Sequence, residues 1–106
     1  MLAAAAADEK QAQDIKILDV RKITPITDFI VVCAGESGPQ LKAISSNIED
    51  KVRKKGLKCL RWEGKVNSNW FILDLGMVIV HVMGEGERQR YKLEEMWGKK
   101  GITYHL

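Results

Sequence analysis

The sequence predicts an α/β domain in which a mixed β-sheet is flanked by helices. Short apolar runs bounded by turn residues alternate along the chain with segments of helical spacing, which is the pattern of such folds. The chain has 106 residues, close to the commonest size of one domain. Hydrophobic residues make up 45% and charged residues 29%, a globular composition, and no apolar run approaches the roughly 20 residues of a membrane span. We therefore expect one domain over residues 1–106.

The N-terminal third predicts one helix and two strands. Residues 1–13 begin with an alanine run of high helix propensity. We expect a helix there, or the truncated remnant of one. Residues 15–20 are a plausible strand, and residues 24–28 are rich in turn formers. Residues 29–34 form a continuous β-branched run that ends at Gly35. This last run has the features of a central strand buried on both faces.

The long helix that follows has clear start and stop signals. Ser37 and Gln40 have the spacing of a capping box, and Pro39 lies in the first turn, where its missing N–H costs nothing. Gly56 is placed to end the helix in the left-handed conformation. One apolar stripe recurs at helical spacing between these signals: Leu41, Ile44, Ile48 and Val52.

The C-terminal half predicts three strands and a second long helix. A loop separates the first strand from the second, and Gly76-Met77 forms a tight turn between the second and the third. In the last helix, Leu93 and Trp97 are an i, i+4 pair that could pack on the sheet. The predicted ranges are strand 57–63, loop 64–69, strand 70–75, strand 78–83 and helix 85–97.

The net charge of +3 is unevenly distributed. Residues 51–65 contain seven basic residues and one acidic residue, which gives this basic segment +6 and the rest of the chain −3. The segment could contact phosphate or an acidic protein face, but it is equally compatible with a solvated helix end and an exposed strand. Cys33 and Cys59 lack CxxC or Cys/His spacing, so we expect reduced thiols in a reducing compartment and no metal site.

Enzyme motifs are absent from the sequence. No Asp-x-Asp pair is available for two-metal chemistry, and neither a P-loop nor a Gly-x-Gly-x-x-Gly fingerprint occurs. His81 lies in a β-branched run and shares a face with Ile79 and Met83, which is usual for a packed or surface strand residue. We therefore predict no catalytic residue, no metal and no cofactor.

One face of the predicted strand 70–75 is a candidate for binding a protein partner. Trp70, Ile72 and Asp74 share one face of the predicted strand 70–75, while the alternate residues share the other. Either this face stays partly exposed and anchors a protein partner, or both faces are sealed by helices. In the first case truncation of Trp70 should weaken binding and leave stability unchanged.

Several segments carry a family resemblance. These are Asp14-Ile15, Leu18-Asp-Val20, Thr27-Asp28-Phe29, Trp70, Leu73-Asp-Leu-Gly76, Val78-Ile-Val-His-Val82 and Arg88 through Tyr91-x-Leu-Glu-x-x-Trp97. Over residues 8–98 the chain resembles the ribosomal silencing factor family, also called Iojap-like proteins. The resemblance implies a nucleotidyltransferase-like fold that has lost its catalytic carboxylates. It also implies that the protein binds large-subunit ribosomal protein number fourteen at the intersubunit face and blocks joining of the ribosomal subunits, as a translation repressor.

The resemblance and the strand face together define the expected partner-binding residues. A homodimer and an incidental contact with ribosomal RNA through residues 51–65 are further expectations. The short N-terminal helix would affect the homodimer if it forms part of the dimer contact. The expected compartment is the bacterial cytoplasm, or an organelle matrix or stroma if a presequence is removed. The alternative function is a metal-dependent nucleotidyltransferase acting on RNA or a nucleotide. The partner-binding residues expected are Trp70, Asp74, Leu75, Gly76, Met77, Val78, His81, Arg88 and Tyr91.

Overall fold

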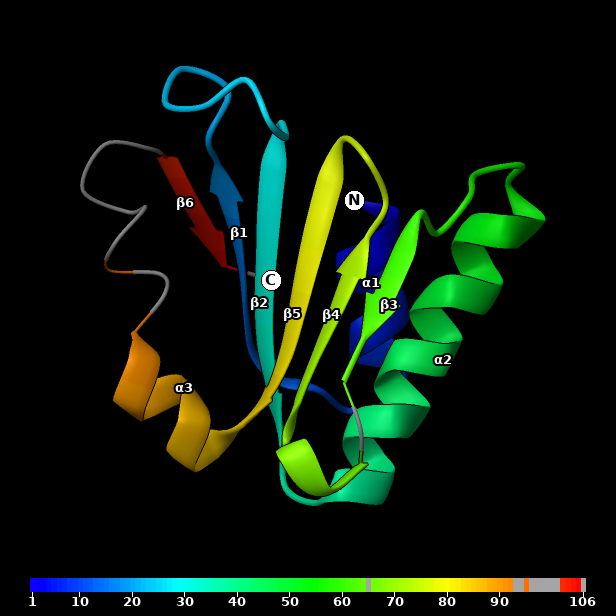
Figure 1. Cartoon of the computed structure of the whole chain (residues 1–106), viewed down its shortest axis with the longest axis vertical. Coiled ribbons are helices and arrows are strands. Elements are labelled where there is room, and N and C mark those ends of the chain that lie inside the picture. Colours follow the sequence, from blue (N-terminus) through cyan, green and yellow to red (C-terminus); the bar gives the residue numbers. More distant parts are fainter. Residues whose placement is uncertain (65, 93–94, 96–101, 106) are drawn as a thin grey trace.

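The fold is one six-stranded sheet with helices on both of its sides (Figure 1). The computed structural model describes residues 1–64, 66–92, 95 and 102–105. Among these residues no helix is long and apolar enough to cross a membrane. In chain order the elements are α1 (Leu2–Glu9), β1 (Gln13–Asp19), β2 (Phe29–Gly35), α2 (Gly38–Lys54), β3 (Arg61–Glu63), the 3-10 turn η1 (Val66–Ser68), β4 (Trp70–Asp74), β5 (Val78–Gly84), α3 (Glu85–Tyr91) and β6 (Ile102–His105).

The sheet is mixed, as the sequence predicted. Its strand order is β3-β4-β5-β2-β1-β6, with β2 and β5 parallel and every other neighbouring pair antiparallel. The β-branched run of β2 lies in the centre, between β5 and β1, and is almost fully buried. The α/β prediction is therefore confirmed, while the nucleotidyltransferase-like label stays a prediction.

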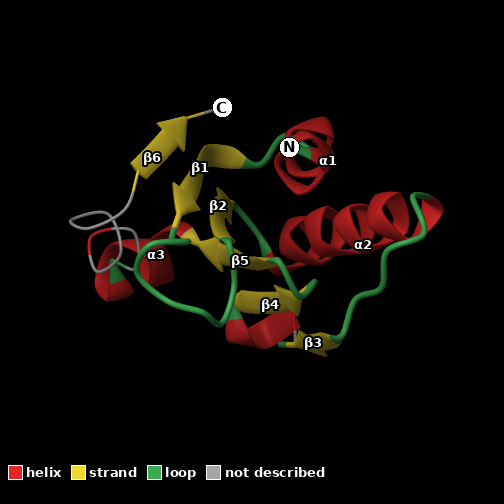
Figure 2. Cartoon of the chain, turned by 90° about the horizontal axis from the view of Figure 1, so that it is seen from above, coloured by secondary structure: helices red, strands yellow, loops and turns green. Residues whose placement is uncertain are grey.

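The two faces of the sheet are covered unequally. α1 and α2 lie together on one side, and α3 lies on the other (Figure 2). The apolar stripe of α2 is buried against the first side, where it meets side chains such as Val31, Phe71 and Val80. The second side carries a smaller buried cluster made of Leu18, Val20, Ile30, Val32 and Met83. Since the seven-residue α3 is much shorter than α2, part of this second face stays exposed.

The start of α2 follows its sequence signals with one difference. The Ser37 hydroxyl accepts a hydrogen bond from the Gln40 backbone N–H at 3.2 Å, as an N-cap does. The Gln40 side-chain oxygen accepts from the backbone N–H of Glu36 at 2.6 Å, one residue before the position that a regular capping box uses. Gly56 takes the predicted left-handed conformation after the helix, with φ of 81°.

Both shorter helices end before the predicted residues. α1 ends at Glu9 and not at residue 13, because Gln11 adopts φ of 62° and the N–H of Ala12 turns back to the carbonyl of Ala7. α3 ends at Tyr91, where Lys92 takes the left-handed conformation. The predicted pair Leu93 and Trp97 lies outside the described residues.

Two strand predictions need correction. The predicted strand 57–63 is reduced to β3, because its partner β4 is only five residues long and turns away after Asp74. β6 was not predicted at all. It pairs with β1 along Lys16–Asp19, and although Ile102, Thr103 and Tyr104 favour a strand, their local sequence does not identify this distant partner.

Candidate partner-binding face

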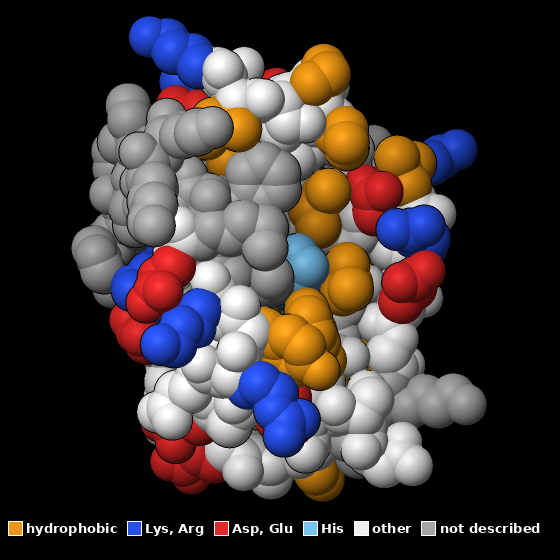
Figure 3. All heavy atoms as spheres, turned by 60° about the vertical axis from the view of Figure 1, so that its left-hand side comes forward, with side chains coloured by type: hydrophobic (Ala, Val, Ile, Leu, Met, Phe, Trp, Pro, Cys, Tyr) orange, Lys and Arg blue, Asp and Glu red, His pale blue; other side chains and the backbone are white. Residues whose placement is uncertain are grey.

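The exposed part of the second sheet face is formed by β4 and β5. We call it the open face and define it by Trp70, Ile72, Asp74, Ile79 and His81, all of which are partly exposed. The antiparallel register places Ile72 opposite His81 and Asp74 opposite Ile79, so these side chains project to the same side. Figure 3 shows hydrophobic side chains gathered in a band beside a histidine, with acidic and basic side chains at its margin.

Trp70 is held by two neighbours on the open face. Its indole N–H donates a hydrogen bond to Nδ1 of His81 at 3.1 Å. The Tyr91 ring of α3 packs on it, with the two ring centroids 4.8 Å apart. Trp70 also packs against the second buried cluster. It is therefore neither sealed in the core nor a free anchor, and its truncation should cost some stability as well as binding.

His81 is electrically neutral at physiological pH in this position. Burial lowers its pKa from 6.5 to about 4, because the charged imidazolium loses hydration there. The Trp70 N–H bond requires the same protonation state, since Nδ1 accepts only when it carries no proton. The open face thus presents an apolar and aromatic surface without a histidine charge.

The turn between β4 and β5 is fixed by its own hydrogen bonds. The Asp74 carboxylate accepts from the Gly76 N–H at 2.9 Å, and Gly76 has φ of 88°. The Leu75 N–H donates to the Val78 carbonyl at 2.8 Å. The Met77 carbonyl accepts hydrogen bonds from the backbone N–H groups of Asp28 and Phe29. Met77 itself is 67% exposed. Asp74 therefore shapes the turn, while Met77 offers an apolar side chain at its tip.

Arg88 lies in a different environment from the other predicted partner-binding residues. It is only 5% exposed and points to β1, where it contacts the backbone of Gln13 and Asp14. Tyr91, one turn later in α3, is 48% exposed and contacts Trp70. Of the nine predicted residues, Trp70, Asp74, His81 and Tyr91 lie at the open face, and Gly76 and Met77 lie in the turn. Leu75 and Val78 pack against the buried cluster on the α2 side of the sheet, and Arg88 lies beneath α3. The list of expected partner-binding residues left out Ile72 and Ile79, although the alternation in both strands places Ile72 on a face with Trp70 and Ile79 on a face with His81.

The basic segment is less free than its composition indicates. Lys51 pairs with Glu9 at 3.6 Å, Lys54 with Asp50 at 3.2 Å, and Arg61 with Glu63 at 3.3 Å. These partners lie partly outside the segment, so counting charges between residues 51 and 65 overstates the local potential. Contact with ribosomal RNA through this segment remains a prediction.

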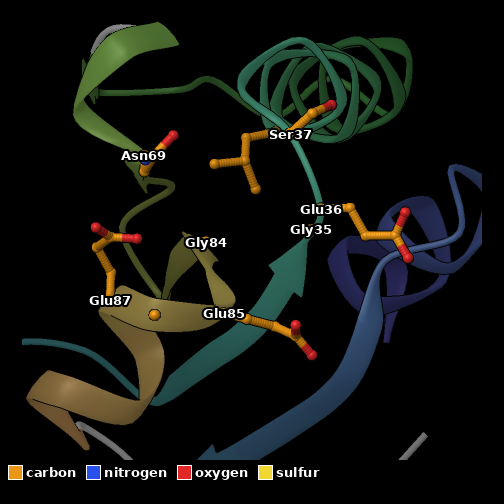
Figure 4. Close-up of a pocket in the computed structure, with 9 residues that line it drawn as sticks. Gly35, Glu36, Ser37, Asn69, Gly84, Glu85 and Glu87 are labelled. Atoms are coloured by element: carbon orange, nitrogen blue, oxygen red, sulfur yellow. The ribbon is translucent and has the colours of Figure 1, made fainter.

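A depression of about 410 Å³ lies where the parallel strands β2 and β5 end. In α/β sheets this is the usual place for a ligand. Its acidic side chains diverge: those of Glu36 and Glu85 extend to one side and that of Glu87 to the other, next to Asn69 (Figure 4). Within the described part of the chain, no group of three His, Cys, Asp or Glu residues is placed to hold a metal ion. An anionic phosphate would meet like charge here.

The two cysteines are free thiols, as predicted. Burial raises the pKa of Cys33 to about 12, and Cys59 also has a raised pKa, with burial as the largest cause. Neither is poised as a thiolate nucleophile at neutral pH.

Comparison with known proteins identifies relatives of this chain. The family model described as "ribosomal silencing factor during starvation" matches residues 1–104. The chain belongs to this family. A relative from Bacillus subtilis named ribosomal silencing factor is 40% identical over 97 residues, which cover 92% of this chain and 82% of that protein.

Two further similarities extend the comparison. A crystal structure of a Chromobacterium violaceum protein superposes with a TM-score of 0.88 at 33% identity, over 92% of this chain and 81% of that one. A mouse protein named "mitochondrial assembly of ribosomal large subunit protein 1" is 30% identical and matches 92% of this chain, which spans 44% of that protein. The family resemblance inferred from the sequence motifs is thereby confirmed.

Proposed function

We propose that this protein is a translation repressor that binds the large ribosomal subunit and blocks joining of the subunits. The proposed contact is large-subunit ribosomal protein number fourteen at the intersubunit face. Membership of the silencing family supports this function, and the name of the mouse relative refers to the ribosomal large subunit. The protein would act where ribosomes are, in a bacterial cytoplasm or an organelle.

The open face is the observation that carries the proposal. An aromatic and aliphatic surface on two paired strands, with Met77 exposed at its tip, is suited to a protein partner. Tryptophan and tyrosine dominate binding energy in such interfaces, and Trp70 and Tyr91 lie together here. A standard interface buries about 800 Å² on each partner, an area that a domain of this size can supply.

The proposed mechanism is steric exclusion. The Cα atoms span 34 × 34 × 22 Å, so a copy bound at the intersubunit face occupies space that the small subunit requires. Such a mechanism requires only binding. It needs no catalytic group, which agrees with the diverging carboxylates of the depression at the ends of β2 and β5. No observation on the described residues favours the alternative, a metal-dependent nucleotidyltransferase.

Co-sedimentation with isolated ribosomal subunits tests the binding proposal. The unmodified protein should pellet with large subunits and not with small ones. Ile72→Lys places a positive charge in the open face, and the residue opposite it in β3 is the oppositely charged Glu63. We expect this variant to lose at least about tenfold in affinity, as central interface positions do.

Leu57→Lys is the matched control for that experiment. Leu57 is 52% exposed, follows α2 and lies outside the open face, so the same change of charge should leave large-subunit binding unaltered. Equal binding by Ile72→Lys and the unmodified protein would show that the open face is not the interface. Equal binding to both subunits would reject the proposed partner.

A further inference from the structure

We propose that Arg88 is a positioning residue which, by anchoring α3 on β1, sets Tyr91 against Trp70 and so orients Trp70 for partner binding. The inference rests on the proposed function in its last step, because it assumes that Trp70 contacts the ribosomal partner. It assigns Arg88 a role beneath the interface in place of direct contact with the partner.

Arg88 binds to a β-bulge in β1. The pairing of β1 with β2 shifts between Gln13 and Lys16, and Asp14 adopts φ of 48°. Arg88 Nη1 donates to the carbonyl oxygen of Gln13 at 3.4 Å and also to that of Asp14. Nη2 lies 3.5 Å from the Asp14 carboxylate. The bulge thus directs two carbonyls and one carboxylate at a single guanidinium.

This contact fixes the position of α3. α3 has seven residues, and so short a helix depends on tertiary contacts for its stability. Arg88 is its one buried residue among those described. Because Arg88 is buried, a movement of α3 along the sheet would take its guanidinium away from the β1 carbonyls and carboxylate while keeping it out of water, which is costly.

The fixed helix carries Tyr91 to Trp70. Tyr91 follows Arg88 by three residues, which places it about one turn further along the helix. Its ring centroid lies 4.8 Å from that of Trp70, at an interplanar angle of 45°. On the other side His81 holds the indole N–H. Trp70 is therefore restrained between β5 and α3, and Arg88 sets one of the two restraints.

Hydrogen exchange of the Trp70 indole N–H reads this restraint directly in the free protein. The indole signal is assigned by its loss in Trp70→Phe. Arg88→Met keeps the apolar stem and removes the donors, and we expect it to speed the exchange about tenfold or more by loosening α3. Arg88→Lys keeps the charge and one donor group and should restore part of the protection. Arg90→Met removes an exposed arginine of the same helix and should change nothing.

Large-subunit co-sedimentation of the same variants completes the test. The inference is supported if Arg88→Met speeds the exchange and weakens binding, with Arg88→Lys between it and the unmodified protein. It is overturned if folded Arg88→Met exchanges like the unmodified protein, or if its exchange rises while its binding stays unchanged. If the unmodified protein itself fails to bind, the proposed function has failed, and the exchange data still report on the Arg88 anchor.

Tyr91→Ala keeps the test decisive should Arg88→Met fail to fold. This variant retains the Arg88 contacts and removes only the ring that packs on Trp70. The Trp70 exchange must then rise as well, since the inference routes the effect of Arg88 through Tyr91. Unchanged exchange in Tyr91→Ala would contradict it.

Discussion

His81 and Trp70 contact each other across two neighbouring strands of the open face. Alternation along β5 places His81 on the same face as Ile79 and Met83, and alternation along β4 places Trp70 on a face with Ile72. The hydrogen bond between His81 and Trp70 depends on the register of the two strands, which no single-strand pattern contains. Arg88 is a similar case, because the Asp14 carbonyl to which it donates lies 74 residues earlier in the chain.

The lowered pKa of His81 predicts a pH dependence of stability. The folded pKa of about 4 lies below the ordinary 6.5, so the unfolded chain binds a proton more readily between these values. The stability that neutral His81 contributes is therefore complete above pH 6.5 and is lost as the pH falls toward 4. Between pH 7 and pH 5 we expect a loss of about 2 kcal/mol, at 1.4 kcal/mol per pH unit.

Urea unfolding of the unmodified protein and of His81→Gln at both pH values measures this contribution. Glutamine retains an acceptor for the Trp70 N–H and does not titrate, so the variant should lose distinctly less stability on acidification. The carboxyl groups of Asp19 and Asp50, whose pKa values are lowered by Arg21 and Lys54, stay ionised in this range and affect both proteins equally. Parallel losses in the two proteins would show that His81 does not carry the effect.

At the scale of elements, Gly64 lies so close to the backbone of β4 that a side chain has no room there. It has φ of 123°, and an added Cβ would lie 2.4 Å from the Trp70 carbonyl oxygen and 2.9 Å from the Phe71 Cα. Because both are backbone atoms, Gly64→Ala must displace β4 itself, and we expect a loss of about 2 kcal/mol or more in unfolding free energy. Chemical denaturation measures it.

Gly56→Ala is the control that separates the two costs of Gly64→Ala, the steric conflict with β4 and the positive φ. Gly56 also has a positive φ, of 81°, but nothing lies within 4 Å of its added Cβ. Only the left-handed conformation is then penalised, by about 1 kcal/mol. A Gly64→Ala variant no less stable than Gly56→Ala would refute the close approach of Gly64 to β4.

The elements that sequence predicted well are those with local signals. α2 has its N-cap, its apolar stripe and its terminal glycine within one segment, and the structure reproduces all three. The hairpin of β4 and β5 likewise depends on Gly76 and neighbouring residues. β3 is shorter than predicted and β6 was missed, because the extent of both is set by their partners β4 and β1.

For the whole molecule, the arrangement of helices creates the candidate site. The order of elements predicted an α/β sandwich, but it left open whether helices would seal both faces. α1 and α2 share one side, and among the helices that the structure describes only α3 lies on the other (Figure 2). The ribosomal partner came from the family motifs and not from composition or charge. Several basic side chains of residues 51–65 pair with an acidic side chain, namely Lys51, Arg53, Lys54 and Arg61.

The central claim is that occupation of the large subunit through the open face prevents subunit joining. A sucrose-gradient joining assay with purified subunits and increasing amounts of the protein tests it most directly. We predict that full ribosomes give way to separate subunits as the protein approaches saturation, that Leu57→Lys acts like the unmodified protein, and that Ile72→Lys is much weaker. Full ribosomes that still form at saturating protein would contradict the claim.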